Sequence, residues 1–393
     1  MNIKSLILGS ATAALAATGA RAADAIVIAE PEPVEYVRIC DVYGAGFFYI
    51  PGTETCLRIG GEIRVQLGTA GDSDIGVGTL NGNYNNMASD QWNSHARGRI
   101  YFDVRSETEL GQLRGYARVD LSRTNGANAP TTNHAWLSLG GFRAGWTDSA
   151  WVSTPQGGRA AGGSHSDNGF FYGYHQTHLI QYNFSGSNGF FGTASVEFDE
   201  TQNANNVANN YTPDLVGVIG VNQGWGAAWL KVGYDSDINT TGRDAIDGGW
   251  GATAGLHYNI PGAPGSSFRL LGYYADSDNN FNPLFNTGLT SWNAGLGVTA
   301  GGPEWSVMAS YHHQFNAKFG ASIAAQWFSD FYVAGTDVST GLDGWALELA
   351  AVWTPVENFT VRTEVIYSDF DTLAGSGIDG DSVSGFVRFS RFF

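Results

Sequence analysis

Lysine is nearly missing from this 393-residue chain, which contains only Lys4, Lys231 and Lys318. The formal net charge is -17, so the chain offers little positive surface and nucleic acid is a poor candidate for a partner. Cysteine is also scarce, with Cys40 and Cys56 as the only two. Beyond the N-terminal segment, no window holds the roughly 18 consecutive apolar residues that a spanning helix requires. A membrane-spanning part would therefore have to consist of strands.

The first 22 residues predict a cleaved signal peptide. Lys4 supplies the positive start, Leu6 to Ala17 form an apolar stretch, and Ala20-Arg21-Ala22 is a small-residue cleavage site. The alternative is a membrane anchor, but the apolar stretch is too short to span a bilayer. The predicted mature chain begins at Ala23, has 371 residues, and carries a charge of -19 because the removed segment contains two basic residues and no acid.

Export explains how the two cysteines are used. Cys40 and Cys56 lie close together in a chain that leaves the cytoplasm, and we predict one disulfide formed in the periplasm. The acidic, proline-containing stretch from Ala23 to Arg38 shows no alternation and is predicted to be a flexible leader. We therefore assign residues 23–56 to a periplasmic N-terminal segment and residues 57–393 to a β-barrel.

What the chain does contain is period-2 alternation of apolar and polar residues. The C-terminal stretch Val383 to Phe393 alternates up to a terminal aromatic, which is typical of an outer-membrane strand. Leu57 to Leu67, His95 to Glu107 and Leu113 to Arg123 alternate in the same way, with charged residues on the polar phase. A soluble β-sandwich also alternates, so this pattern alone does not choose between the two folds.

Strand length and tryptophan spacing favour the membrane barrel. The alternating segments run about ten residues or more, which is the length of a tilted membrane strand and longer than a usual globular strand. Trp345 and Trp353 share the outward phase of one segment. At about 3.3 Å per residue and a tilt of about 40°, they lie roughly 20 Å apart, close to the height of an apolar band between two aromatic girdles.

The connections alternate between short and long, as in barrels with short periplasmic turns and long extracellular loops. Short connections are predicted at Thr108 to Gln112, Gly140-Gly141, Ser185 to Gly189 and Gly301 to Glu304, and long ones at Gly68 to Ser94, Asp148 to Gln176, Glu200 to Thr212, Ser236 to Gly248 and Ser277 to Thr290. Seventeen segments qualify as strands, but closed bacterial barrels have even numbers, and the region from Trp305 to Phe328 is ambiguous. The predicted fold is all-β: a transmembrane antiparallel β-barrel of about 16 strands.

Arginines concentrate on the polar phase of the first strands. Eight of the seventeen arginines fall between Arg58 and Arg123. Seven of them make a basic patch on one predicted inner wall: Arg58, Arg64, Arg97, Arg99, Arg105, Arg114 and Arg118. The alternative is that they pair with Glu62, Asp103, Glu107 and Asp120 and only stabilise the wall. The mid-strand residues Arg97, Arg99, Arg114 and Arg118 are the predicted pore-constriction residues.

Several segments resemble the general porins of alphaproteobacteria, of the Brucella and Rhizobium type. The clearest is the N-terminal run Ala23 to Val27, Glu30 to Val34, Glu35 to Cys40 and Gly44 to Arg58, supported by Gly141 to Gly145 and Phe386 to Phe393. The resemblance implies a homotrimer of water-filled barrels that pass ions and small hydrophilic solutes across the outer membrane, among lipid and lipopolysaccharide. It also implies a third loop folded inward as a constriction, and cross-linking of Ala23 to peptidoglycan through its amine.

The segment from Asp148 to Gln176 is the expected constriction loop. It carries Asp148 and Asp167 together with glycines that permit a tight inward path. Acids on the loop facing arginines on the wall would set up a transverse field that orders water and dipolar solutes. Asp148 and Asp167 therefore join the predicted constriction.

Other motifs support no chemistry. Asp235 to Asn239 and Asp276 to Asn280 resemble fragments of calcium loops, but both lack the glycine and the distal glutamate of a complete site. The pair His312-His313 has no cysteine or further histidine nearby in sequence, and no Ser-centred hydrolase motif is present. We expect no cofactor, no metal site and no enzyme activity. A substrate-specific channel such as a sugar porin, and a closed barrel with an adhesin or structural role, remain the alternatives to a general diffusion channel.

Overall fold

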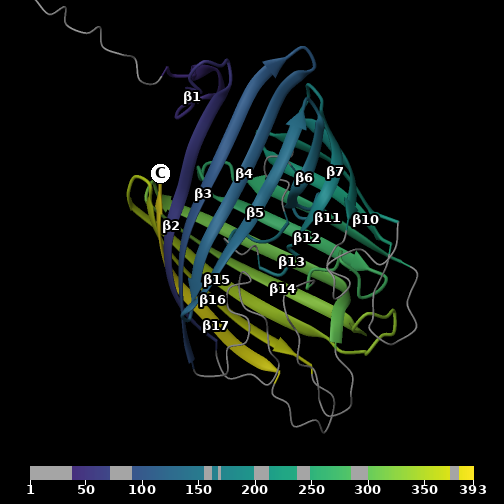
Figure 1. Ribbon diagram of the computed structural model, residues 1–393. Coiled ribbons are helices and arrows are strands. Elements are labelled where there is room, and N and C mark those ends of the chain that lie inside the picture. Colours follow the sequence, from purple (N-terminus) through teal and green to yellow (C-terminus); the bar gives the residue numbers. More distant parts are fainter. Residues whose placement is uncertain are drawn as a thin grey trace, which may run out of the picture. The chain divides into compact units, whose positions relative to one another are not determined.

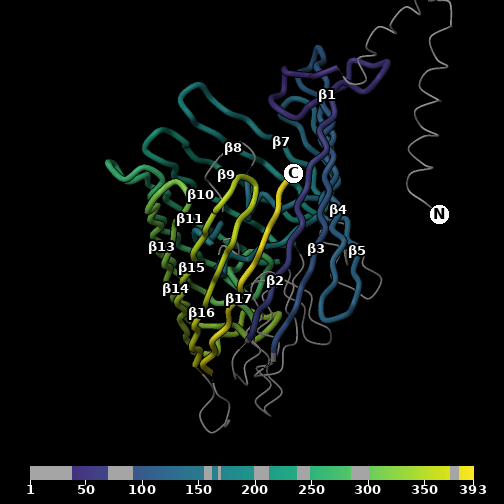
Figure 2. Tube along the Cα trace, turned by 90° about the vertical axis from the view of Figure 1, so that its left-hand side faces the viewer, coloured from purple at the N-terminus to yellow at the C-terminus, as the bar shows by residue number. Residues whose placement is uncertain are grey.

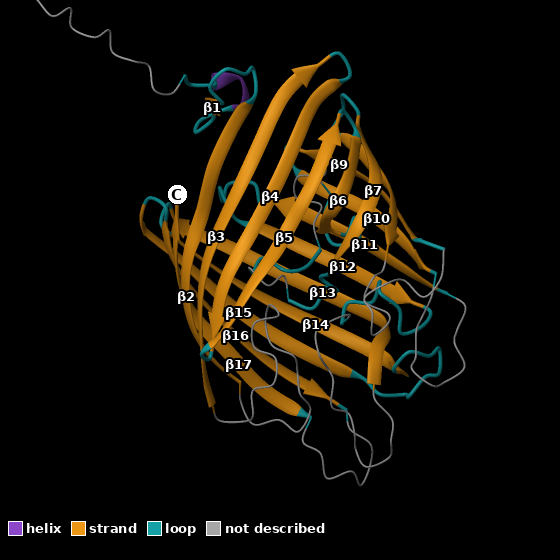
Figure 3. Cartoon of the chain, viewed as in Figure 1, coloured by secondary structure: helices purple, strands orange, loops and turns teal. Residues whose placement is uncertain are grey.

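The computed structural model describes residues 38–70, 91–154, 162–166, 170–198, 212–236, 248–284, 300–371 and 380–393. Residues Ile39–Phe393 form one compact unit made almost wholly of strands (Figure 1, Figure 3). The one helix in the described ranges is a single 3-10 turn, η1 (Asp41–Tyr43). No described helix is long and apolar enough to cross a membrane. The predicted signal peptide and most of the leader lie outside the described residues.

Sixteen strands in the described ranges form one closed antiparallel sheet. Each pairs with the next along the chain, and the last pairs with the first, as Figure 2 shows for β17 beside β2. Their bounds are β2 (Cys56–Ala70), β3 (Gln91–Thr108), β4 (Gly111–Thr124), β5 (Ala127–Leu139), β6 (Phe142–Asp148), β7 (Gln176–Ser185), β8 (Phe190–Phe198), β9 (Asp214–Gln223), β10 (Gly226–Asp235), β11 (Gly249–Asn259), β12 (Ser267–Ala275), β13 (Ala300–Asn316), β14 (Phe319–Val333), β15 (Gly344–Val356), β16 (Phe359–Phe370) and β17 (Asp381–Phe392). The predicted barrel and its strand number are confirmed.

The period-2 alternation sorts side chains between the two faces of the sheet. On β2, Ile63, Val65 and Leu67 are about half exposed on the outer face, whereas Glu62 and Arg64 are buried on the inner face. Successive side chains of a strand point to opposite faces, so one phase supplies an apolar exterior and the other a polar lumen. The lumen is therefore lined by the polar phase that the sequence identified.

Aromatic residues gather near the ends of the outer face. Trp345 and Trp353 on β15 are 40% and 50% exposed, as expected from their shared phase. Trp345 packs against Tyr367 with ring centroids 5.2 Å apart, and Tyr274 packs against Trp305 at 4.6 Å. Such amphipathic rings suit the boundary between lipid hydrocarbon and water.

One predicted connection is wrong, and the structure resolves the region that the sequence left ambiguous. Gly301 to Glu304 was predicted to be a turn, but it lies inside β13, where the register against β14 shifts between Ala300 and Pro303. The prediction was wrong because a local irregularity accommodates the Gly-Gly-Pro sequence without ending the strand. The ambiguous region from Trp305 to Phe328 belongs to two strands, β13 and β14, separated by residues 317–318. This resolves the count at sixteen.

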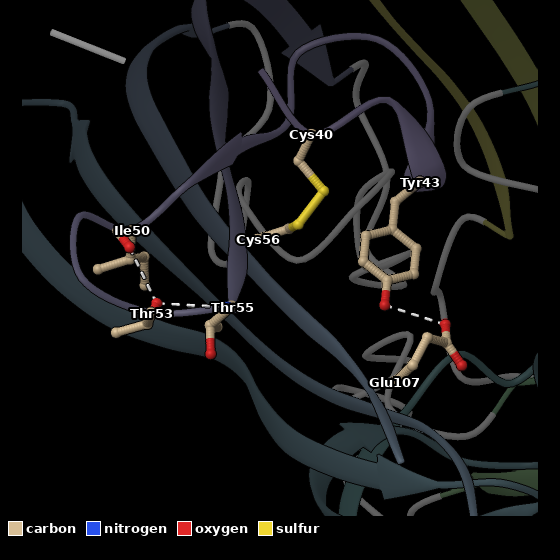
Figure 4. The surroundings of a disulfide bond; sticks show 7 residues. All are labelled: Cys40, Tyr43, Ile50, Thr53, Thr55, Cys56 and Glu107. Atoms are coloured by element: carbon tan, nitrogen blue, oxygen red, sulfur yellow. Dashed lines mark hydrogen bonds between the residues drawn. A yellow bond between two sulfur atoms is a disulfide. The ribbon is translucent and has the colours of Figure 1, made fainter. Parts of the chain in front are cut away.

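A disulfide lobe, residues 39–56, packs beside the start of the barrel. The predicted Cys40–Cys56 disulfide is present (Figure 4). The two-residue strand β1 (Phe48–Tyr49) pairs with β2. The Tyr43 hydroxyl donates to Glu107 Oε1 on β3 at 2.9 Å. Burial first, and then this carboxylate, raise the pKa of Tyr43. The lobe is thereby tied both to itself and to the barrel wall.

Candidate functional site: the lumen of the barrel

The seven predicted wall arginines share the inner face of β2, β3 and β4. These strands are hydrogen-bonded neighbours, and their register places Arg64 opposite Arg97, Arg99 opposite Asp120, and Arg105 opposite Arg114. Adjacent positions of like charge would repel unless carboxylates lay between them. Carboxylates on the same inner face are therefore required to offset the repulsion between these arginines.

Two carboxylates organise the arginines that lie deeper in the wall. Glu62 accepts from Arg64 Nε at 2.9 Å and from Arg97 Nη2 at 2.8 Å. Asp120 accepts two parallel hydrogen bonds from Arg99 Nε and Nη2, both at 2.7 Å. This bidentate geometry is the strong form of an arginine-carboxylate pair.

Asp103 organises a second cluster near the disulfide lobe. It accepts from Arg105 Nη2 at 2.7 Å and from Arg114 Nε at 2.8 Å, while Arg58 Nη2 lies 3.5 Å from its Oδ2. One carboxylate thus serves three guanidinium groups. For six of the seven arginines, the structure supports the paired interpretation that the sequence left open. Glu107, the fourth predicted partner acid, accepts instead from Tyr43.

Arg118 is the exception on this wall. Within the described ranges it makes no ion pair, and its Nε is buried without a hydrogen-bond partner. It lies within electrostatic reach of Arg99, Asp120 and Tyr174. Because Asp120 is already hydrogen-bonded to Arg99, Arg118 has no ion-pair partner of its own among the described residues.

The loop between β6 and β7, residues 149–175, is here called L3, and its described parts, residues 149–154, 162–166 and 170–175, contact the inner face of the barrel. Its Ser164 hydroxyl donates to Glu348 Oε1 on β15 at 2.8 Å. The ring of His165 lies between the hydroxyls of Ser310 on β13, 2.7 Å from Nδ1, and Ser267 on β12, 2.9 Å from Nε2. Because L3 starts at β6 and contacts β12, β13 and β15, it crosses the lumen as the resemblance implied.

The two ends of L3 are fastened separately. Near its start, Lys231 Nζ on β10 donates to the Trp151 carbonyl at 2.6 Å, and the Ala150 amide donates to Glu197 Oε1 on β8 at 2.9 Å. Near its end, Gln326 Nε2 on β14 donates to the Phe171 carbonyl at 2.7 Å. Contacts from several strands hold the loop across the lumen.

The two predicted loop acids have different outcomes. Asp148, the last residue of β6, accepts from the Tyr174 hydroxyl and from Gln176 Nε2, each at 2.9 Å, and lies 4.0 Å from His134 Nε2. It is thus bonded at the root of L3, and none of its recorded bonds joins it to a predicted wall arginine. Asp167 lies outside the described residues.

Sequence reasoning missed three lumen residues that the fold brings into contact with the site. They are Trp136 on β5, Lys231 on β10 and Glu348 on β15. The alternation His134, Trp136, Ser138 would have placed Trp136 inward, since its phase matches Tyr116 across the register. No local signal identifies Lys231 or Glu348 as partners of L3, because those contacts join residues far apart in the chain.

The aspartate-rich motif Asp276 to Asn280 secures loop backbones, whereas residues 237–239 of the motif Asp235 to Asn239 lie outside the described residues. Asp276 accepts from the Trp250 amide at 2.7 Å, and Asp278 accepts from the amides of Gly302 and Gly335, each at 2.7 Å. Burial raises the pKa of Asp278, and these amide bonds oppose that rise. In the parts of the chain that the structure describes, no group of three or more metal-ligating side chains is found.

Comparison with known proteins gives a consistent result. The profile described as "Porin subfamily" matches residues 24–384. Porin Omp2b of Brucella suis and porin Omp2a of Brucella melitensis are each 34% identical, with alignments that cover all of both chains. Among solved structures, the outer-membrane channel DcaP of Acinetobacter baumannii has a TM-score of 0.64 at 15% identity, covering 87% of this chain and 99% of that one. The anion-selective porin from Comamonas acidovorans has a TM-score of 0.55 at 13% identity, covering 86% and 100%.

Proposed function

This chain belongs to the porin subfamily, and on that premise we propose how its outer-membrane diffusion channel selects among solutes. Ions and small hydrophilic molecules pass between the arginine wall of β2–β4 and L3, without energy input or a catalytic step. The observation that carries the proposal is the path of L3, whose His165 contacts Ser267 and Ser310 far from the strands that flank the loop. A loop held across the lumen narrows a barrel that would otherwise be an open tube.

The wall side of this proposed constriction consists of Arg97, Arg99, Arg114 and Arg118. Because Arg97, Arg99 and Arg114 are neutralised by carboxylates at 2.7–2.8 Å, their fixed dipoles order water more than they attract anions. Arg118 supplies the unbalanced positive charge. Asp148 and Asp167 supply the acidic groups in this proposal, with Asp148 acting from the root of the loop, 4.0 Å from His134 Nε2.

The channel is proposed to assemble as a homotrimer through the outer face of β2–β5. A shallow groove on that face is lined by aliphatic and small side chains, including Ile63, Val65, Ala96, Gly98 and Leu121. Small residues let a second surface approach the backbone closely, which suits contact with another copy of the chain. The remaining outer face, with its aromatic ends, is then left to outer-membrane lipid and lipopolysaccharide.

The predicted tether to peptidoglycan is a separate proposal. It concerns the amine of Ala23, a residue outside the described ranges, and the acidic leader that follows it. Mass spectrometry of digested peptidoglycan from cells that express the protein tests it directly. Muropeptides that lack any peptide of this chain would count against the tether.

A planar bilayer tests the channel itself. Purified protein added to a bilayer with a salt gradient is expected to give large conductance steps in groups of three, with weak ion selectivity. Replacing both Asp148 and Asp167 with Asn is expected to make the channel more anion-selective, so the reversal potential should move toward the equilibrium potential of chloride. An unchanged potential would remove these acids from the constriction, and the absence of steps would favour a closed barrel with an adhesin or structural role.

A further inference from the structure

Three aromatic rings stack across the inner wall near the disulfide lobe. They belong to Tyr101 on β3, Tyr116 on β4 and Trp136 on β5, which together are called the aromatic shelf. The Tyr101 and Tyr116 ring centroids are 5.9 Å apart, and those of Tyr116 and Trp136 are 5.3 Å apart, with interplanar angles of 25° in both pairs. All three side chains are partly exposed. The shelf is therefore partly accessible from the lumen and is not packed into a core.

Arginines lie over the rings of the shelf. The guanidinium carbon of Arg143 on β6 lies 4.1 Å from the Trp136 ring centroid, and that of Arg114 lies 4.9 Å from the same centroid. At the other end, Arg58 lies 5.6 Å from the Tyr101 centroid. Stacking on an aromatic face holds a guanidinium in a fixed plane while leaving its N–H edge available to an acceptor.

Positive charge exceeds negative charge at this surface. Asp103 is the described carboxylate bonded to Arg114, and it also pairs with Arg105 and lies near Arg58. Arg143 makes no ion pair with any described residue, and its Nε is buried without a hydrogen-bond partner. Asp103 is thus the one described carboxylate bonded to either guanidinium over Trp136, and Asp148 acts on Arg143 without forming an ion pair. Arg143 is therefore left without a hydrogen-bonded anion among the described residues.

Glycines keep space at both ends of the shelf. A Cβ on Gly60 would collide with the Tyr101 hydroxyl, and a Cβ on Gly145 would lie 2.6 Å from the Trp136 Cα. Gly145 also has a φ of +136°, a conformation that side-chain-bearing residues rarely adopt. Gly60 thus leaves room for the Tyr101 hydroxyl, and Gly145 lets its strand approach the backbone of Trp136 closely.

We propose that the aromatic shelf, with Arg114 and Arg143, is a low-affinity binding site for small organic anions that carry both a carboxylate and a flat ring. The carboxylate of the solute accepts hydrogen bonds from Arg143, whereas Arg114 stays paired with Asp103 and adds its charge from the other side of Trp136. The ring of the solute lies against the exposed parts of Tyr116 and Trp136. This inference rests on the proposed diffusion channel, because such solutes must reach the lumen. A neutral sugar would use the rings but leave Arg143 without a counter-charge.

Inhibition of the potassium chloride current by benzoate tests the site in the full-length channel. Benzoate is expected to halve the conductance at a concentration about tenfold lower than acetate, which has no ring, or benzyl alcohol, which has no charge. Glucose is the probe for a sugar site. The conductance before any probe is added reports whether the channel is open, so failure of the channel and failure of the binding site are distinguishable.

Two variants assign the inhibition to the shelf. Trp136→Leu and Arg143→Gln are each expected to raise the half-blocking benzoate concentration about fivefold or more. Arg362→Gln is the matched control, because it also removes one inner arginine charge, on β16, away from the shelf. Equal inhibition by benzoate and acetate in the wild type, or equal benzoate inhibition of all four proteins, would overturn the proposal. Stronger inhibition by glucose than by benzoate would replace it with a sugar site.

Discussion

Gly61 and Phe393 exchange two backbone hydrogen bonds. The Gly61 amide donates to the Phe393 carbonyl at 2.9 Å, and the Phe393 amide donates to the Gly61 carbonyl at 3.1 Å. This exchange extends the pairing of β17 with β2, whose last register pair is Phe392 and Glu62. Closing the sheet in this way leaves none of the described barrel strands as an unpaired edge, and unpaired amides would be costly inside a membrane.

Gly61→Ala is expected to weaken this closure. A Cβ there would collide with the Arg99 carbonyl and lie 2.7 Å from the Phe393 ring. Overpacking of this kind costs about 1–3 kcal/mol, so the heat-denaturation midpoint of the folded protein should fall. Gly217→Ala on β9 is the control, because nothing lies within 4 Å of its Cβ position. Equal midpoints for the two variants would contradict the close-approach argument.

The Cys40–Cys56 disulfide is expected to stabilise the lobe of residues 39–56 more than the barrel. It spans a sequence separation of 16, and a loop of about that length gains roughly 3 kcal/mol from the cross-link. Replacing both cysteines with serine should therefore make the lobe sensitive to protease while the strands stay protected. Tyr43→Phe, which removes only the bond to Glu107, should have a smaller effect. Cleavage within the barrel at the same rate as in the lobe would argue against this division.

The alternation of residue types was sufficient to predict the barrel and the inward phase of β2–β4, although a turn was wrongly predicted at Gly301 to Glu304, inside β13. The prediction succeeds because successive residues of a barrel strand face lipid and water in turn, which gives the sequence a period of two, as at Ile63 and Arg64. The same reasoning would have reached Trp136, which follows the phase of its strand. Composition and alternation thus determine which face a side chain occupies.

Sequence reasoning reached partners on neighbouring strands but not partners across the lumen. Arg114 and Asp103 lie eleven residues apart on neighbouring strands, so their pairing follows from the register and was one of the two predicted alternatives. Lys231 and Trp151 are separated by 80 residues and meet only because L3 folds back across the lumen. The shift in β13 at Pro303 was equally hidden, since a turn and a bulge share the same glycines and proline.

His165→Ala is expected to loosen L3. The variant removes two hydrogen bonds, to Ser267 and Ser310, each worth about 1 kcal/mol. The loop should then sample wider positions, which would raise the mean single-channel conductance and add flicker. The control is His313→Ala on the same strand as Ser310, because His313 contacts Tyr311 on the outer side. Identical conductance traces for His165→Ala and the wild type would show that this contact does not hold the constriction.

Arg118→Gln is expected to move ion selectivity toward cations. Arg118 is the wall arginine without an ion pair in the described ranges, so its charge acts on ions in the lumen without being cancelled nearby. Arg118→Lys should keep the reversal potential close to that of the wild type, because a positive charge at that position is sufficient for the selectivity. Lys318→Gln, in the exposed turn between β13 and β14, should change the reversal potential little, since salt screens a charge outside the lumen over about 10 Å. If Lys318→Gln shifts the potential as much as Arg118→Gln does, general surface charge rather than the constriction sets selectivity.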